Sequence, residues 1–273
     1  MLFFPNCKIN LGLHILNKRE DGFHNLETVF YPVGLKDALE IIPSHNANTA
    51  IEFISSGLVV DGNSDDNICI KAYHLLKKDF PELPAVKMHL HKTIPMGAGL
   101  GGGSADGAFT LQLLNKKCDL NLSTPALLNY ALQLGSDCPF FIINKPCYAT
   151  GRGEILEEIS IDLSKYKIVL VNPGIHVNTG WAFSQLTPAL PKKSIKEIIM
   201  QPITSWQQAL QNDFEISVFE KYPAIKKIKE TLYQHGAIYA AMSGSGSSVY
   251  GLFEKEITLP QFSDTNYFVK TIA

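Results

Sequence analysis

The first part of the chain alternates between apolar and polar residues, which is the pattern of a β-strand with two different faces. The apolar positions are Cys7, Ile9, Leu11, Leu13 and Ile15, and the positions between them are Lys8, Asn10, Gly12 and His14. Because successive side chains of a strand point to opposite faces, the apolar set is expected to contact a core. The other face, with its lysine, asparagine and histidine, is the first candidate for a functional surface.

The same kind of pattern predicts further strands and helices. Strands are expected at residues 26–33, 39–42, 51–54, 86–90, 147–159, 167–171, 237–242, 248–253 and 267–272. Helices are expected at 67–78, 105–114, 125–134, 179–185, 193–200 and 223–235, with Thr124 as the N-cap of the third. Strands and helices do not alternate regularly, so the sequence predicts an α+β fold, with domains at 1–160 and 161–273.

The run IPMGAGLGGGSADGAFT, at residues 94–110, contains six glycines between a predicted strand and a predicted helix. Glycine allows positive φ angles and leaves no Cβ in the way, so successive N–H groups can converge on an anion. The helix that follows presents its positive dipole end. The run therefore predicts a nucleotide-binding loop, whose contacting residues are Pro95, Met96, Gly97, Ala98, Gly99, Leu100, Gly101, Gly102, Gly103 and Ser104.

Two better-known glycine loops compete with this interpretation. A Walker A loop is excluded, because Ser104 and Ala105 stand where a Lys-Ser/Thr pair is needed. A dinucleotide fingerprint matches at Gly97, Gly99 and Gly102, but the required second strand with its acidic end does not follow. A nicotinamide-dependent oxidoreductase and a plain flexible loop stay open as alternatives.

Composition narrows the class of protein. The chain has 273 residues, 45% of them hydrophobic, and a formal net charge of −2, with lysines and arginines scattered along it. That balance predicts no nucleic-acid partner. We expect a cytoplasmic protein without membrane contact or obligate protein partner, because the sequence shows neither a long apolar stretch nor a signal peptide. The five cysteines lack metal-site spacing and are expected to be buried thiols.

Three separated blocks together resemble the GHMP kinases: PNCKINLGLHILNKREDGFHNLETV, the glycine-rich loop, and MSGSGSSVYG. Shorter motifs at 21–24, 136–141, 151–154 and 212–215 narrow the resemblance to members that phosphorylate a cytidyl-diphosphate sugar alcohol in non-mevalonate isoprenoid synthesis. The resemblance implies a domain similar to ribosomal protein S5 followed by a ferredoxin-like domain, with ATP and Mg²⁺ as cofactors. Another small-alcohol GHMP kinase is the alternative within the family.

The resemblance also implies catalytic roles. Asp137 would accept the proton of the substrate hydroxyl, and Lys8 would neutralise charge on the phosphoryl group in transfer. From local sequence alone, Asp137 could instead be a helix N-cap and Lys8 a solvated lysine. Asn67 and Lys92 would lie on the nucleotide side, although Asn67 could equally cap the next helix.

The substrate end is implied by shorter motifs. His24 would read cytosine, Phe23 and Phe183 would sandwich the base, and Asn10 would share the site of Lys8. Core packing is the alternative for both phenylalanines, and edge-strand polarity for Asn10. Two departures from the family pattern are Phe23, where Tyr is frequent, and Ala105, where a second Ser is frequent.

Three assignments stay loose. Ser104 is a candidate Mg²⁺ ligand, since Mg²⁺ takes few protein ligands. The glycine-serine cluster at 242–248 is either a hairpin turn or a second wall of the nucleotide site. Asp213 matches a family motif but could be a helix cap.

Overall fold

The computed structural model describes residues 1–44, 49–59, 66–255, 262 and 266–272. These residues form two compact units, each assembled from several stretches of the chain. Unit 1 comprises Met1–Cys7, Gly34–Met96 and Gly101–Lys145, and unit 2 comprises Lys8–Val33, Gly97–Leu100 and Pro146–Ala273. The predicted domains at 1–160 and 161–273 are continuous stretches, and their boundary stays a prediction.

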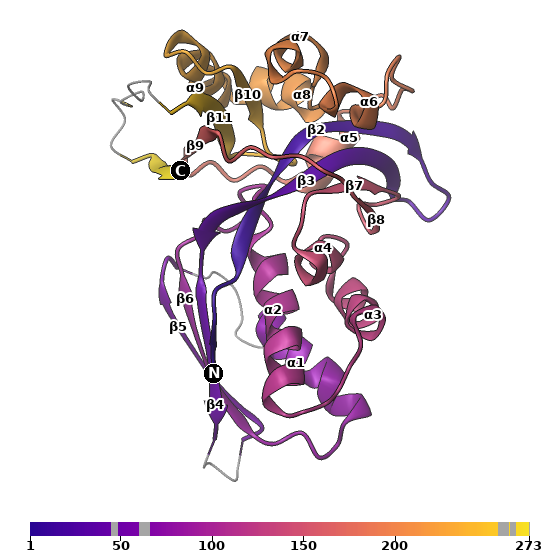
Figure 1. Ribbon diagram of the computed structural model, residues 1–273, viewed down its shortest axis with the longest axis vertical. Coiled ribbons are helices and arrows are strands. Elements are labelled where there is room, and N and C mark those ends of the chain that lie inside the picture. Colours follow the sequence, from indigo (N-terminus) through magenta and orange to yellow (C-terminus); the bar gives the residue numbers. More distant parts are fainter. Residues whose placement is uncertain (45–48, 60–65, 256–261, 263–265, 273) are drawn as a thin grey trace. The chain divides into compact units, whose positions relative to one another are not determined.

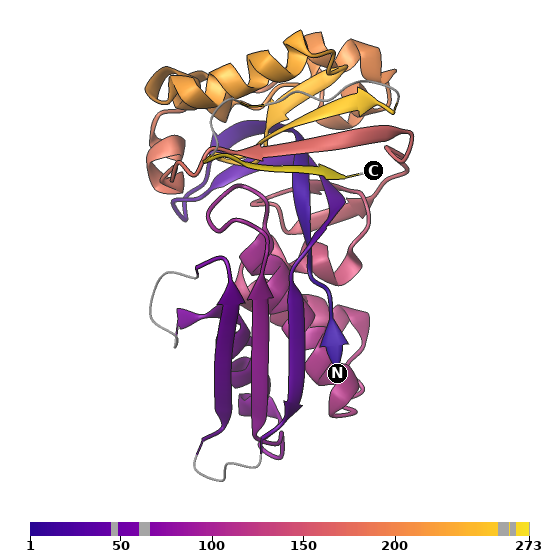
Figure 2. The ribbon, with the colours of Figure 1, turned by 90° about the vertical axis from the view of Figure 1, so that its left-hand side faces the viewer.

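Unit 1 is a four-stranded sheet with helices against one face (Figures 1 and 2). The strands, in spatial order, are β1 (Leu2–Phe3), β4 (Ala38–Pro43), β6 (Val86–Lys92) and β5 (Ile51–Gly57). Only β5 and β6 run parallel among these neighbours. The helices are α1 (Ile68–Asp79), α2 (Gly102–Lys117), α3 (Thr124–Leu134) and α4 (Cys138–Ile143).

Helix caps in unit 1 follow from local sequence, with one correction. Asn67 caps α1, because its side chain accepts a hydrogen bond from the Cys69 N–H at 2.9 Å. The predicted N-cap Thr124 of α3 is wrong: Ser123 is the cap, and its side chain accepts from the Ala126 N–H. Thr124 already belongs to the helix, and Pro125 fits the first turn because no intrahelical N–H bond is needed there.

Unit 2 contains one four-stranded sheet and most of another, since the first residues of β2 (Asn6–Lys18) and the last residues of β3 (His24–Lys36) belong to unit 1. The divided sheet has the order β2, β3, β7 (Cys147–Thr150) and β8 (Ile155–Glu158). The other has the order β10 (Tyr239–Met242), β11 (Val249–Glu254), β9 (Tyr166–Asn172) and β12 (Phe268–Ile272). The helical segments are α5 (Thr179–Ser184), α6 (Ile195–Ile199), η2 (Ile203–Ser205), α7 (Trp206–Ala209), α8 (Phe214–Lys221) and α9 (Pro223–Gln234).

The core of unit 2 lies between helices and the second sheet. Helix α9 buries Ile225, Ile228 and Leu232, a spacing of three and four residues that forms one apolar stripe. This stripe packs against β10 and β11, while Leu13 and Ile15 from β2 join the same buried cluster. The apolar face predicted for residues 7–15 is therefore a core face.

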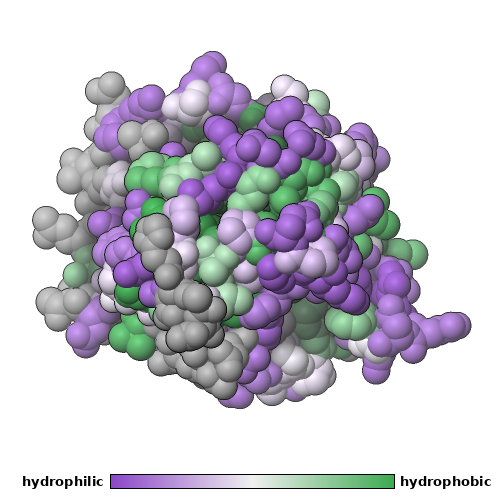
Figure 3. Space-filling model, turned by 90° about the horizontal axis from the view of Figure 1, so that it is seen from below, coloured by the Kyte–Doolittle hydropathy of each residue, from purple (hydrophilic) through white to green (hydrophobic). Residues whose placement is uncertain are grey.

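The surface shown in Figure 3 mixes hydrophilic and hydrophobic residues in small patches. No helix in the described part of the chain is long and apolar enough to cross a membrane. All five cysteines remain thiols, and four of them are buried as predicted, whereas Cys118 is half-buried.

Candidate active site

The glycine-rich loop has the backbone geometry that its sequence predicts. Gly97, Gly99 and Gly101 have φ angles of 59°, 77° and 69°. An L-residue rarely adopts such angles, so glycine is required for this path. Residues 97–100 belong to unit 2, whereas the residues from Gly101 to the end of α2 belong to unit 1.

Within unit 2, the loop packs against the glycine-serine turn between β10 and β11. The Ser243 hydroxyl donates to the Gly99 carbonyl at 2.8 Å, and the Ser248 N–H donates to the Ala98 carbonyl at 3.1 Å. A Cβ atom on Gly99 would lie 1.9 Å from the Ser243 carbonyl oxygen, so no side chain fits there. The second cluster is therefore more than a hairpin connection, since it supports the first loop.

The Asn212 side chain fixes the backbone of the glycine-serine turn. Its side-chain amide donates to the carbonyls of Met242 and Gly244, each at 2.8 Å, and the residue is 3% exposed. Asn212 was not among the predicted site residues. The motif at 212–215 was the only signal in the sequence that could have pointed to it.

The polar face of β2 forms a buried network in unit 2. Lys8 donates from Nζ to Asn10 Oδ1 at 2.6 Å, and Asn10 donates from Nδ2 to Thr28 Oγ1 at 3.0 Å. The Ser243 hydroxyl accepts from the Asn10 N–H at 3.2 Å, and the Lys8 N–H donates to the Leu100 carbonyl at 2.9 Å. Lys8 and Asn10 are 4% and 2% exposed, so the solvated-lysine alternative is wrong.

In unit 1, α2 begins directly after the loop, with Gly101 as its N-cap. Its first turn therefore presents backbone N–H groups, and the helix dipole favours an anion there. Ser104 in this turn lies in hydrogen-bonding contact with the Cys138 thiol, whose pKa burial raises to about 12. The neutral thiol leaves the Ser104 hydroxyl beside an uncharged neighbour.

Asp137 occupies the N-cap position of α4, as its local sequence predicts. In the described structure its side chain makes no capping hydrogen bond to the helix, which Pro139 and the apolar residues after it form. Asp137 is half-buried and belongs to unit 1, whereas Lys8 belongs to unit 2, so their pairing stays a prediction.

Lys92 has a different environment from the one that the resemblance implied. Its Nζ atom bonds to Asp37 and, at 2.7 Å, to Asp106, and its side chain is fully buried. Both carboxylates counteract the desolvation of the ammonium, and the pKa of Lys92 is raised overall. A buried ammonium held by two carboxylates does not favour direct contact with a nucleotide.

The aromatic residues predicted to bind a pyrimidine are only partly together. His24 and Phe183 stack with ring centroids 5.0 Å apart and planes 18° apart, and Phe214 meets Phe183 edge-on at 4.9 Å. Phe23 instead lies under the Arg152 guanidinium and is 52% exposed. Burial, aided by the charge of Lys18, lowers the pKa of His24, which favours a neutral ring.

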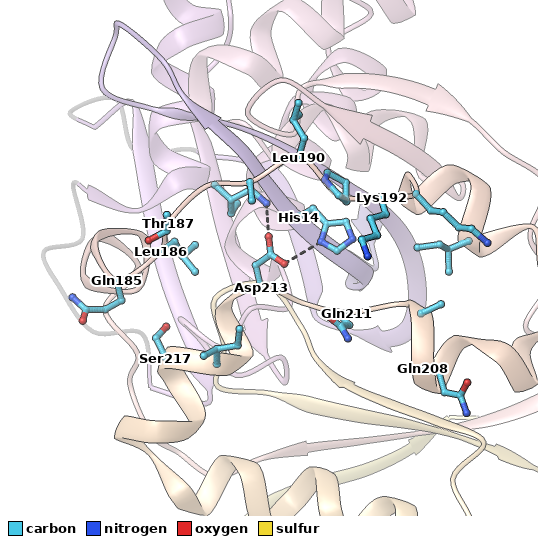
Figure 4. A pocket seen from close by; sticks show the side chains of 17 residues that line it. His14, Gln185, Leu186, Thr187, Leu190, Lys192, Gln208, Gln211, Asp213 and Ser217 are labelled. Carbon is cyan, nitrogen blue, oxygen red and sulfur yellow. Dashed lines mark hydrogen bonds and ion pairs between the residues drawn. The ribbon is translucent and has the colours of Figure 1, made fainter.

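A cavity of about 740 Å³ in unit 2 is lined by none of the residues predicted to be catalytic or to bind nucleotide or substrate (Figure 4). His14 and Asp213 meet in its lining, with Nδ1 and Oδ1 3.0 Å apart, while Asp213 Oδ2 accepts from the Ile15 N–H at 2.8 Å. Asp213 also occupies the N-cap position of α8, but in the described structure its carboxylate makes no capping bond to that helix and bonds to β2 instead.

Comparisons with known proteins agree with this architecture. The family models described as GHMP kinases N terminal domain and GHMP kinases C terminal match residues 67–145 and 192–264. The chain belongs to the GHMP kinase family. The predicted α+β fold and the predicted class, an ATP-dependent small-molecule kinase, are thereby confirmed, and the oxidoreductase alternative is wrong.

Individual relatives are similar over almost their whole length. The 4-diphosphocytidyl-2-C-methyl-D-erythritol kinase of Bacteroides fragilis is 53% identical over 264 residues, covering 96% of this chain and 96% of the relative. The protein of that name from Porphyromonas gingivalis is 42% identical, covering 98% and 97%. A crystal structure of a 4-(cytidine 5'-diphospho)-2C-methyl-D-erythritol kinase has a TM-score of 0.78 at 27% identity, covering 100% and 99%.

Proposed function

We propose that this protein transfers the γ-phosphoryl group of ATP to the 2-hydroxyl of 4-diphosphocytidyl-2-C-methyl-D-erythritol, giving ADP and the 2-phosphate. The observation that carries this proposal is the 53% identity, over 96% of both chains, to a relative of that name. The reaction would be a step of non-mevalonate isoprenoid precursor synthesis in the cytoplasm.

The glycine-rich loop supports the nucleotide part of the proposal. Its positive φ angles at Gly97, Gly99 and Gly101 let backbone N–H groups face an anion, and α2 begins at its end. Transfer of a phosphoryl group depends mainly on such positioning and on neutralisation of charge. We assign the triphosphate to this loop and to the first turn of α2.

Lys8 and Asp137 are each proposed as catalytic residues. The contact with Asn10 holds the Lys8 ammonium in one orientation. Its charge is therefore already placed for the phosphoryl group, and no change of rotamer is needed. Asp137 is half-buried at the start of α4. It would take the hydroxyl proton while the substrate oxygen bonds to phosphorus and ADP leaves.

Mg²⁺ is proposed as the metal that accompanies ATP. No group of three or more His, Cys, Asp or Glu side chains suited to a metal occurs among the described residues. Mg²⁺ keeps several waters and binds mainly substrate phosphates, so we propose the Ser104 hydroxyl as its oxygen ligand from the protein. The ion would supply charge neutralisation for the phosphate oxygens.

The cytidyl end is assigned to His24 and Phe183. Their stacked rings form an aromatic surface of the kind on which a pyrimidine stacks, and a neutral His24 can donate or accept a hydrogen bond at a base edge. Phe23, exposed beside Arg152, is proposed as the outer contact of the base.

The test is an ADP-release assay with purified protein, ATP and Mg²⁺. We expect ADP only when 4-diphosphocytidyl-2-C-methyl-D-erythritol is added, and a product heavier by one phosphate group. Homoserine and mevalonate serve as control acceptors, because solved kinases for both share this fold. ADP release that is equal with either control acceptor, or absent with the cytidyl substrate, would refute the assignment.

A further inference from the structure

The cluster formed by Asp37, Lys92 and Asp106 joins the two ends of the glycine-rich loop within unit 1. Lys92 is the last residue of β6, which leads into the loop, and Asp106 lies on α2, which leaves it. The Lys92 ammonium bonds to Asp106 at 2.7 Å and also contacts Asp37. One buried cation therefore ties the strand before the loop to the helix after it.

Asp37 extends this tie to the backbone of the segment after β6. Its Oδ1 atom accepts hydrogen bonds from the N–H groups of Thr93 at 2.6 Å and Ile94 at 2.9 Å. The Asp37 N–H itself donates to the Pro5 carbonyl at 2.8 Å. The chain direction at residues 92–94 is thus set by one carboxylate, three residues before the first glycine of the loop.

The start of α2 is packed tightly against the same cluster. A Cβ atom on Gly102 would lie 2.8 Å from a methyl carbon of Ile94 and 3.4 Å from the Lys92 ammonium. Gly102 therefore lets the helix start approach the strand end closely. The position of the first turn of α2 relative to β6 depends on the cluster and on this contact together.

The composition of the cluster does not favour a purely stabilising role. Its three side chains are almost completely buried, with two carboxylates around one ammonium. Asp106 Oδ1 is buried and has no hydrogen-bond partner in the described part of the chain. A buried ionic group of this kind is often no better for stability than apolar residues of similar volume, whereas it can fix one orientation.

We propose that Asp37, Lys92 and Asp106 are positioning residues for nucleotide binding, which hold the two ends of the glycine-rich loop in its anion-binding geometry. The inference rests on the proposed function, since it assumes that the loop holds the triphosphate. Lys92 would then act through α2 and the loop rather than by touching the nucleotide.

The test compares Asp106→Ala with Asp106→Asn in the full-length protein. Asp106→Ala removes the bond to Lys92, so we expect the Kd of a non-hydrolysable ATP analogue, and the KM for ATP, to rise about tenfold or more. The kcat at saturating ATP and the KM for the cytidyl substrate should stay within about threefold. Asp106→Asn keeps an oxygen acceptor for Lys92 and should restore most of the nucleotide affinity.

Leu113→Ala is the matched control, because Leu113 lies on the same helix and is fully buried but is not part of the cluster. It should lower the melting temperature without changing the Kd of the ATP analogue. If Asp106→Ala is folded and binds the analogue as wild type does, or if Leu113→Ala weakens binding equally, the positioning role is refuted.

The two proposals fail in different ways. Analogue binding is measured by calorimetry without any acceptor, so an incorrect acceptor assignment leaves this test intact. Wild-type protein that binds no nucleotide would instead refute the proposed function.

Discussion

The contact between Gly99 and Ser243 allows a stability prediction with an internal control. Gly97 and Gly99 both have positive φ angles, 59° and 77°. A Cβ atom on Gly97 would meet only the His176 ring, no closer than 3.4 Å, whereas on Gly99 it would lie 1.9 Å from the Ser243 carbonyl oxygen. Gly97→Ala and Gly99→Ala therefore share the backbone penalty and differ in the clash.

The structure sets the magnitude of the difference. A left-handed backbone costs a non-glycine residue about 1–2 kcal/mol, and both variants pay this. In Gly99→Ala the turn must also move by more than 1 Å, since real Cβ contacts essentially never fall below 3.0 Å. That movement breaks the bonds from Ser243 and Ser248 to the loop, each worth about 0.5–1.5 kcal/mol.

Thermal unfolding of the two variants is the assay. At about 2–4 °C per kcal/mol, the loss of about 1–3 kcal/mol should make Gly99→Ala melt about 2–12 °C below Gly97→Ala. Calorimetry with an ATP analogue should show the weaker binding in Gly99→Ala, because the turn that supports the loop has moved. Equal melting temperatures for the two variants would show that the loop and the glycine-serine turn are not packed as described.

Three further predictions follow from single contacts. Asp137→Asn should lower kcat by about 10²-fold or more with unchanged analogue affinity, because it removes the base and keeps the size of the side chain; normal turnover would exclude Asp137 as the base. Phe183→Ala should raise the KM for the cytidyl substrate by the factor that corresponds to the stacking free energy of one base, about 1–3 kcal/mol, and leave the KM for ATP unchanged. The same variant should destabilise the protein by less than the ~3–5 kcal/mol that loss of a fully buried phenylalanine costs. An unchanged KM for the cytidyl substrate would show that Phe183 is not part of the pocket. Burial raises the pKa of Glu215, although the charge of Lys229 opposes this. The folded state therefore binds the proton more tightly than the unfolded state, and stability falls as pH rises from 4.5. In Glu215→Gln the melting temperature should fall less between pH 4 and 7 than in the wild type.

Much of the fold could be predicted from periodicity because the elements are long or strongly patterned. Helix α9 repeats its apolar residues every three or four positions, and β9 contains a continuous apolar run at residues 168–171. Three α-helices were missed, namely α4, α7 and α8, and α7 has only four residues. Helix α4 has six residues and is apolar all round, and α8 carries Phe214 and Glu215 buried side by side, so neither shows a regular stripe.

The candidate site was harder to predict, because its contacts join distant parts of the chain. Residues 7–15 predict one core face and one polar face, yet Lys8 and Asn10 are buried as well. They are covered by Thr28, Leu100 and the turn at Ser243, which lie 18 to 233 residues away from Asn10. No local pattern contains such contacts, so from the residues alone Lys8 had to be interpreted as solvated.

The burial of Lys92 could have been predicted from the sequence pattern, although the family resemblance did not indicate it. Val86, Met88 and Leu90 alternate as the buried face of β6, and the same period of two places Lys92 on that face. A lysine on a core face needs carboxylate partners, because an unpaired buried ammonium is too costly. Periodicity therefore predicts burial and pairing for Lys92, and the bonds to Asp37 and Asp106 satisfy both requirements. Only the identity of the two partners required the structure.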